Sequence, residues 1–397
     1  MEEITLTAKI KLSINKEDKI LLDKTLSFYT KACNFVSKHI FETKNLKFYS
    51  LNKELYNTLR SKFDLKSQMT QSVIKTVIAK YKTILKNQKK WIKPKFNLPE
   101  YDLVWNRDYS LNKNFFSVNT LTKRVKLSFF IQGMEKYFDK TIYKFGTAKL
   151  VRKRKKYYLH IPITFNVNEV NINDICNVIG IDRGINFIVT TYDSNHKTGF
   201  VNGKYIKHKR ALYSKVRKSL QERNTPSSKR RLRKIGQREN RWIQDINHQV
   251  SKALVENNPS PTLFVIEDLT NIRQSTERVR LKDRYVSVSW AFYDLEQKLV
   301  YKAKQRGSVV LKVDPRYTSQ CCPHCGYIEK SNRNKKLHSF KCKNCNYKSN
   351  DDRIGAMNLY HLGINYLIDK NVNNALIDTV TLEHISSVKG AVNHPTM

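Results

Sequence analysis

The stretch VIGIDRGINF, residues 178–187, places one carboxylate, that of Asp182, in an apolar run with a glycine on either side. The continuous apolar character before Asp182 is typical of a buried strand. A charge at such a position is costly unless it is paired or binds a cation, although Asp182 alone is equally consistent with a turn residue. We expect Gly180 and Gly184 to leave this strand edge open to a metal ion and a phosphate backbone. Arg183 is expected to meet nucleic acid or solvent.

Two further acidic positions occur in comparable settings far along the chain. Glu267 ends the apolar run TLFVIE, and Asp351 and Asp352 open the helical pattern of DDRIGAMNLYHL. Singly, Glu267 could pair with a nearby arginine, and Asp352 could be a helix N-cap. Together with Asp182 they indicate one site, because residues 176–313 are predicted to run strand, strand, strand, helix, strand, helix, strand.

This order of elements matches an RNase H-like fold. In that fold an Asp of the first strand, a Glu of a later strand and an Asp of the final helix converge at one edge of the sheet. Such acids bind two Mg²⁺ ions about 3.5–4 Å apart and support in-line phosphodiester hydrolysis. Oxygen ligands suit Mg²⁺, which also keeps water ligands and takes phosphate. The sequence therefore predicts a two-magnesium site built from Asp182, Glu267 and one of the two adjacent aspartates.

Five of the seven cysteines lie within residues 321–345, an arrangement that favours a metal site over disulfides. Two CxxC pairs are separated by sixteen residues, which is the spacing of a four-thiolate zinc site. The paired cysteines are Cys322, Cys325, Cys342 and Cys345. His324 and His338 could replace a thiolate, but four thiolates explain the spacing without them. Because four protein ligands leave no open position, we predict one structural Zn²⁺, with Cys321 as a spare thiol.

The charge of the chain predicts a polyanionic partner. Its 397 residues include 74 Lys and Arg against 34 Asp and Glu, a formal net charge of +40, and nucleic acid is the expected partner. No apolar run is long enough to cross a bilayer, and the N-terminus lacks the apolar segment of a signal peptide, which predicts a cytoplasmic protein. Residues 204–255 are predicted to form two basic helices broken near NTPSS. The side chains expected to contact phosphate there are Lys204, Lys207, Lys209, Arg210, Lys215, Arg217, Lys218, Lys229, Arg230, Arg231, Arg233 and Lys234.

The N-terminal part is predicted to be a β unit interrupted by helices. Strand patterns cover residues 3–13 and most of 115–168, and helical patterns cover 16–43, 52–62 and 68–88. Four aromatic residues lie among basic ones and could stack on bases, although core packing is the commoner role for each. They are Trp91, Tyr101, Trp105 and Tyr109.

Several motifs resemble those of TnpB, a family of transposon-encoded RNA-guided DNA endonucleases related to the miniature type V CRISPR effectors. The matching blocks are VIGIDRG, RENRWIQDINHQVSKALV, VIEDL, SWAFYDLEQKLVYKAKQRG, VDPRYTSQCCPHCG and NDDRIGAMNLYHLG. The resemblance implies that Asp182, Glu267 and Asp352 are the catalytic triad. Asp352 is chosen by counting back six residues from Asn358, in line with the family pattern Asp-x-Asn-Ala-Ala-x-Asn. Ile354 and Gly355 replace the usual Asn and Ala of that pattern.

The resemblance also implies an architecture. Residues 1–174 would form a wedge β-barrel with a helical recognition insertion at about 16–90. Residues 175–370 would form an RNase H-like (RuvC) nuclease domain, α/β in class, with a zinc-ribbon insertion at about 315–350. Residues 371–397 would be a polar tail.

The implied function is RNA-guided, Mg²⁺-dependent cleavage of double-stranded DNA by a monomer bound to a guide RNA from the transposon end, in the bacterial cytoplasm at the nucleoid. In such systems base pairing reads the target sequence while the protein reads a short flanking motif and backbone shape. Two alternatives remain: a guided DNA-binding repressor or accessory protein that does not cut, and a structure-selective nuclease that needs no guide.

Overall fold

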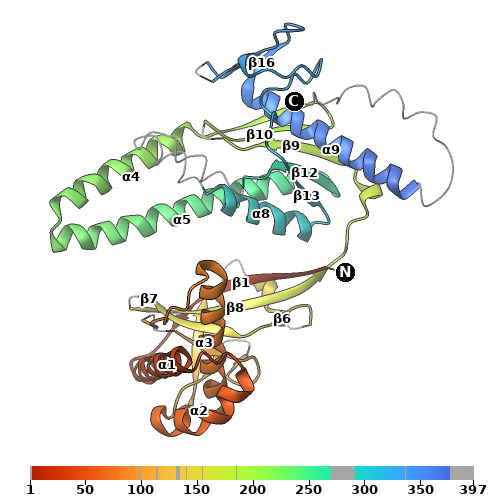
Figure 1. The fold of residues 1–397 in the computed structure, drawn as a ribbon. Helices are drawn as coiled ribbons and strands as arrows, with labels where there is room; N and C mark the ends of the chain where they lie inside the picture. The colour runs from red at the N-terminus through yellow and green to blue at the C-terminus, as the bar shows by residue number, and fades with distance from the viewer. Residues whose placement is uncertain are drawn as a thin grey trace. The chain divides into compact units, whose positions relative to one another are not determined.

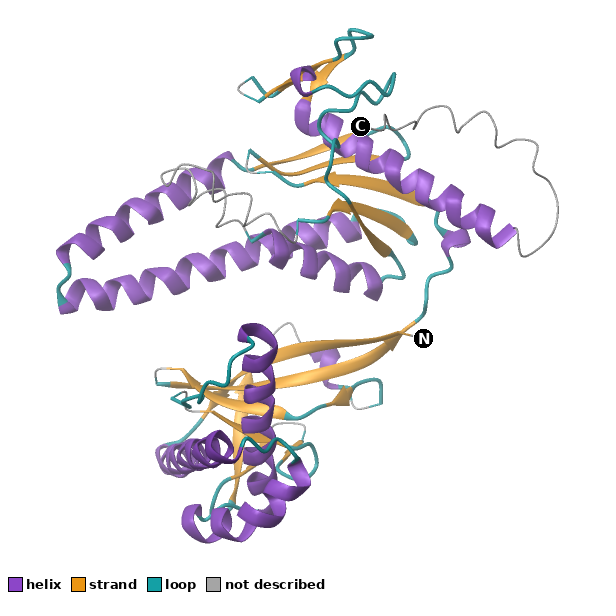
Figure 2. Cartoon of the chain, in the orientation of Figure 1, coloured by secondary structure: helices purple, strands orange, loops and turns teal. Residues whose placement is uncertain are grey.

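The computed structural model describes residues 2–97, 100–112, 115–130, 135–139, 141–153, 155–184, 186–269, 291–335 and 337–375. The chain divides into two compact units, residues 1–166 and 167–397, and each is treated by itself below (Figures 1 and 2). The boundary predicted at 174/175 falls in the segment between the last strand of the first unit and the first strand of the second. Of the predicted tail, residues 371–375 continue a helix, and 376–397 lie outside the described residues.

The N-terminal unit combines a sheet with three helices that lie between its first two strands in sequence. The helices are α1 (Lys16–Thr43), α2 (Phe48–Phe63) and α3 (Ser67–Gln88). The strands are β1 (Glu2–Ser13), β2 (Glu100–Leu103), β3 (Tyr109–Leu111), β4 (Phe115–Asn119), β5 (Arg124–Phe130), β6 (Lys144–Phe145), β7 (Ala148–Lys153) and β8 (Lys156–Val167). Their order in the sheet is β2-β7-β8-β1-β5-β4-β3, with β6 paired to β8. The three helical patterns predicted within residues 16–88 therefore correspond to three helices between β1 and β2.

The helices of this unit begin and end where local chemistry favours it. The side chain of Asn15 accepts a hydrogen bond from the Asp18 N–H at 2.7 Å, which caps α1, and Lys44 ends it in a left-handed conformation. Tyr101 and Tyr109 are fully buried in the core, and Trp91 and Trp105 pack against it. Tyr101 and Tyr109 are thus core residues, and Trp91 and Trp105 pack against the core while remaining partly exposed.

The C-terminal unit is a five-stranded sheet with helices on both faces. Its elements are β9 (Asn177–Asp182), β10 (Phe187–Asp193), β11 (Thr198–Asn202), α4 (Lys204–Arg223), α5 (Pro226–Glu256), β12 (Thr262–Glu267), α8 (Phe292–Gln305), β13 (Val309–Val313) and α9 (Asp351–Ala375). The strand order is β11-β10-β9-β12-β13, antiparallel through the first three strands and parallel from β9 to β13. This is the order expected of an RNase H-like domain.

The two faces of this sheet follow the period of two along each strand. Ile179, Ile181 and Ile266 belong to the core that faces α5 and α8. Val178 and Val265 belong to a second core beneath α9. Since Asp182 and Glu267 are even steps from Val178 and Val265, both carboxylates point to the α9 face.

The predicted break in the basic helical region is confirmed. Asn224 ends α4 in a left-handed conformation, and Thr225 caps α5 by accepting from the Ser228 N–H at 3.1 Å, with Pro226 in the first turn. The two helices form a long hairpin (Figure 1). Across the described residues, no helix is sufficiently long and apolar to span a bilayer.

Between β13 and α9 lies a small three-stranded sheet that carries the cysteines. Its strands are β14 (Arg333–Asn334), β15 (Ser339–Lys341) and β16 (Lys348–Asn350), in the order β14-β15-β16. We call residues 315–350 the ribbon, with the bounds expected from the sequence.

Candidate active site and metal centre

The fold brings the three predicted acids to one cavity. Ile181 of β9 pairs with Ile266 of β12 in parallel register, so the next residues, Asp182 and Glu267, end their strands side by side. Helix α9 crosses the same face and begins at this edge. A cavity of about 800 Å³ is lined by Asp182, Glu267 and Asp352 together. Three acids, each 85 positions from the next along the sequence, therefore line the same cavity.

The three carboxyl groups of the cavity have raised pKa values, so their ionised forms are costly unless a cation is bound. Burial raises the pKa of Asp182 well above its usual range, and the neighbouring Glu267 and Asp352 raise it further. Burial is also the main cause of the raised pKa values of Glu267 and Asp352. Clustered carboxylates with raised pKa values are typical of functional sites.

Asp351 and Asp352, adjacent in sequence, have different surroundings. Asp352 lines the cavity. Asp351 is fully buried, accepts from Arg333 Nε at 2.8 Å and lies 3.5 Å from His338 Nδ1. The structure thus gives the cavity position to Asp352, the residue chosen by motif register.

The residues flanking Asp182 differ from expectation. A Cβ on Gly180 would lie 2.0 Å from the Ala356 carbonyl oxygen of α9, so this glycine permits close packing of a helix rather than access for a metal or phosphate. Gly184 does line the cavity. Arg183 is buried: it pairs with Glu296 at 3.3 Å and donates to the main-chain oxygen of Glu267. The expectation that Arg183 meets nucleic acid or solvent was wrong, because it points to the opposite face from Asp182.

Two further cavity residues come from the ribbon and were not anticipated. Thr318 donates its hydroxyl to Glu267 Oε1 at 2.5 Å. Arg333 lies 3.8 Å from Asp352 Oδ1, and its charge lowers the pKa of Asp182 and of Glu267. Nothing distinguishes Arg333 from the other basic residues of its segment in sequence, and Thr318 is an ordinary polar residue three positions before the cysteine cluster.

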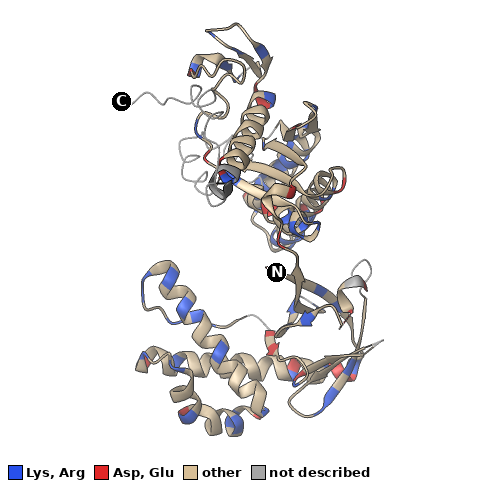
Figure 3. Cartoon of the chain, turned by 90° about the vertical axis from the view of Figure 1, so that its right-hand side faces the viewer, with Lys and Arg blue, Asp and Glu red and all other residues tan. Residues whose placement is uncertain are grey.

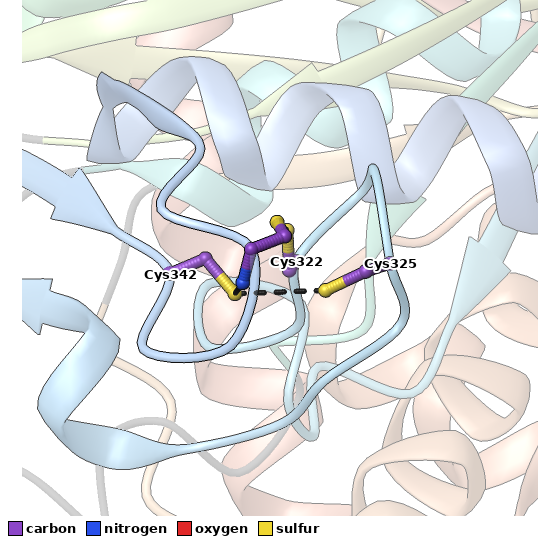
Figure 4. Close-up of side chains that lie close together, drawn as sticks. Cys322, Cys325 and Cys342 are labelled. Carbon is purple, nitrogen blue, oxygen red and sulfur yellow. Dashed lines mark hydrogen bonds between the residues drawn. The ribbon is translucent and has the colours of Figure 1, made fainter.

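The four paired cysteines gather as the spacing predicted. Figure 4 shows three of them, Cys322, Cys325 and Cys342, close together. Their sulfurs all lie within 4.8 Å of one another, and two pairs, Cys322 with Cys345 and Cys325 with Cys342, are 3.6 Å apart. Tetrahedral zinc with Zn–S bonds of about 2.3 Å requires sulfurs about 3.8 Å apart. A hydrogen bond from the Tyr327 N–H lowers the pKa of Cys325 to about 6, which favours its thiolate. The site fits zinc in its donor set and its dimensions.

The predicted phosphate-contacting residues of the hairpin differ in their surroundings. Arg210 and Arg217 both pair with the buried Glu239 of α5, at 3.5 and 2.5 Å, and so join the two helices. Lys209 lies 4.3 Å from the ring centroid of Trp242. The exposed members are Lys204, Lys207, Lys215, Lys218, Lys229, Arg230, Arg231, Arg233 and Lys234.

The strand order, the three acids that line one cavity and the four-cysteine ribbon define a fold of the RNase H-like class. Among solved structures, a Cas12f1–sgRNA–target DNA complex matches with a TM-score of 0.54 at 13% identity, covering 90% of this chain and 99% of that one. CasPhi-2 (Cas12j) bound to crRNA matches with a TM-score of 0.55 at 11% identity, covering 91% and 98%. At these identities the likeness concerns the fold alone.

The chain belongs to the family of TnpB-like proteins. It is 31% identical over 211 residues to the TnpB-like protein MJ0751 of Methanocaldococcus jannaschii, covering 52% of this chain and 75% of that protein. A family model described as a probable transposase matches residues 160–274, and one described as Cas12f1-like, TNB domain, matches 292–359.

Longer relatives are matched over part of their length. Identity is 31% over 258 residues to the CRISPR-associated endodeoxyribonuclease Cas12f1 of Syntrophomonas palmitatica, covering 57% of this chain and 50% of the relative. It is 29% over 229 residues to the putative RNA-guided DNA endonuclease InsQ of Escherichia coli, covering 52% and 54%. The chain thus spans about half the length of these relatives.

Proposed function

We propose that the protein is an RNA-guided, metal-dependent DNA endonuclease. The observation that carries this proposal is the convergence of Asp182, Glu267 and Asp352 on one cavity with raised pKa values. Buried carboxylates without compensating partners are costly, and binding divalent cations offsets that cost. Relatives named as RNA-guided or CRISPR-associated endonucleases support the same reaction class.

In this proposal the three acids hold two Mg²⁺ ions, which when bound supply an activated water and stabilise the leaving oxygen. The chain's own groups shape the site. The Thr318 hydroxyl orients the Glu267 carboxylate, and the Arg333 guanidinium moderates the negative charge of the cluster. One Zn²⁺ held by the four paired cysteines would keep the ribbon folded against α9.

The nucleic-acid partners are a guide RNA and double-stranded target DNA. The net charge of +40 and the exposed cations of the α4–α5 hairpin support a polyanionic partner. Figure 3 shows that Lys and Arg positions also recur along the helices of the N-terminal unit. We assign that unit, as a wedge barrel with a helical recognition insertion, to guide and target binding. Arg210 and Arg217 are left out of the phosphate contacts because Glu239 already pairs with them.

The test begins with sequencing the RNA that co-purifies with the full chain, which then serves as guide in a cleavage assay on matching duplex DNA. Asp182→Asn and Glu267→Gln should abolish cutting and leave RNA binding unchanged. Asp369→Asn, which removes an exposed carboxylate further along the same helix as Asp352, is the matched control and should cut normally. Cutting by either active-site variant would overturn the catalytic assignment. Guided binding without cutting by wild type would favour a repressor, and cutting of branched DNA without RNA a structure-selective nuclease.

A further inference from the structure

The ribbon does more than follow the nuclease core in sequence, because it supplies a hydrogen bond to a catalytic acid. Thr318 is 4% exposed, and its hydroxyl lies 2.5 Å from Glu267 Oε1 and 3.0 Å from the Pro315 carbonyl oxygen. A hydroxyl that contacts one carboxylate oxygen fixes the rotamer of that carboxylate and leaves the other oxygen for a metal ion. Glu267 accepts at its side chain from Thr318, while Arg183 holds its main-chain oxygen.

The segment that carries Thr318 is fixed from α9. The side-chain amide of Asn358, which is 8% exposed, donates to the Thr318 carbonyl at 2.7 Å and to the Cys321 carbonyl at 2.9 Å. Asn358 lies six residues after Asp352 on the same helix. One buried amide therefore ties the helix that bears one acid to the segment that orients another.

The same segment leads directly into the zinc site. Cys322, four residues after Thr318, is a predicted zinc ligand. The buried Asn332 donates to the Gln320 carbonyl at 3.2 Å and accepts from the Lys343 N–H at 2.9 Å, which links the first cysteine pair to the second. These hydrogen bonds, together with the backbone of residues 318–322, therefore join both halves of the four-cysteine cluster to Thr318.

We propose that Thr318 is a positioning residue for Glu267, and that the zinc ribbon acts through Thr318 to set the affinity of the acidic cluster for divalent cations. This inference rests on the proposed function. Groups that orient a metal ligand from outside the coordination sphere typically contribute about 10- to 100-fold to metal affinity.

The test measures metal binding without nucleic acid or catalysis. Mn²⁺, which carboxylates bind as they do Mg²⁺, is titrated into the full-length protein, and free ion is counted by its electron paramagnetic resonance signal. Thr318→Val, which keeps the shape and removes the hydroxyl, should weaken Mn²⁺ binding about 10- to 100-fold. Thr318→Ser should restore it. Thr262→Val is the matched control, since Thr262 is equally buried at the opposite end of β12 and its hydroxyl contacts Pro259.

A second comparison tests transmission from the zinc site. Cys345→Ser, on the cysteine pair farther along the chain from Thr318, should weaken Mn²⁺ binding in wild type but add little in the Thr318→Val background, because both changes act through one path. Asn358→Ala should also weaken Mn²⁺ binding in wild type and add little in the Thr318→Val background, and it leaves every zinc ligand unchanged. Melting curves and zinc content accompany each variant.

The outcomes separate the inference from the proposed function. Mn²⁺ affinity of Thr318→Val equal to that of wild type would overturn the positioning role while leaving the nuclease proposal in place. Equal losses from Cys345→Ser in both backgrounds would overturn transmission through Thr318. Wild-type protein that takes up no Mn²⁺ would overturn the proposed metal site and this inference with it.

Discussion

Gly180 sits where β9 meets the backbone of α9, and Gly180→Ala tests that packing directly. A Cβ at this position would lie 2.0 Å from the Ala356 carbonyl oxygen and 2.4 Å from the Tyr360 nitrogen. Ordinary contact needs about 3.5 Å, so the helix would have to withdraw by more than about 1 Å. Backbone atoms of a helix cannot move aside singly. The whole first half of α9 has to shift.

The expected loss is both thermodynamic and catalytic. Overpacking a close-packed core costs about 1–3 kcal/mol or more, and α9 covers Val178 and Val265 as well as Gly180. Asp352 lies about one helical turn before Ala356, so a displaced helix carries this acid away from Asp182 and Glu267. A misplacement of about 1 Å can reduce a rate about 100-fold. We expect guided cleavage by Gly180→Ala to fall by that order.

Thermal unfolding and guided cleavage measure the two effects, and Gly236→Ala is the matched control. Gly236 lies within α5, and a Cβ there would meet no atom within 4 Å. The same substitution should therefore stabilise the hairpin by up to about 1 kcal/mol through helix propensity. If Gly180→Ala melts and cuts like wild type, the close approach of α9 to β9 is wrong, and so is the placement of Asp352.

Three other perturbations have defined outcomes. Cys322→Ser should lower bound zinc, measured by atomic absorption, and expose the ribbon to proteolysis; zinc content equal to wild type would contradict the four-thiolate site. Glu296→Gln leaves Arg183 without its buried anionic partner and should destabilise the fold by about 3–5 kcal/mol in denaturant titration, whereas Glu17→Gln, exposed in the first turn of α1, should cost no more than about 1 kcal/mol. Because the pKa of Asp182 is raised in the folded protein, the metal-free protein loses stability as pH rises from the ordinary carboxyl range through that raised value. The rise in melting temperature that Mg²⁺ produces should therefore be larger at pH 8 than at pH 5. A rise that does not change with pH would count against metal binding by this cluster.

The features that could be predicted from the sequence are those whose signal is local. An apolar run that ends in an acid identified β9 and β12, and apolar residues at helical spacing identified α1 with bounds of 16–43. The CxxC spacing predicts that the two sulfurs of each pair lie close together, because each pair lies on one tight turn. In each case the residues that make the signal are neighbours along the chain.

The features that could not be predicted depend on which elements meet. Gly180 is needed because Ala356 of α9, far later in the sequence, packs against it, and Arg210 is internal because Glu239 lies opposite it on α5. Basic composition alone does not separate a cation that pairs within the hairpin from one that faces solvent. Thr318 likewise gains its contact with Glu267 only when the chain returns to the sheet after β13.

The charge arrangement around the acids distinguishes a metal site from a set of satisfied salt bridges. Arg183 and Arg333 both lower the pKa of Glu267, but their hydrogen bonds in the described residues go elsewhere: Arg183 donates to the main-chain oxygen of Glu267, and Arg333 donates its Nε to Asp351. Direct bidentate pairing would satisfy the carboxylate oxygens. Arginines that lie near a carboxylate without donating to it favour its ionised form and leave its oxygens available to metal ions from solution. Burial in turn keeps the remaining charge costly, which gives the cluster its affinity for divalent cations.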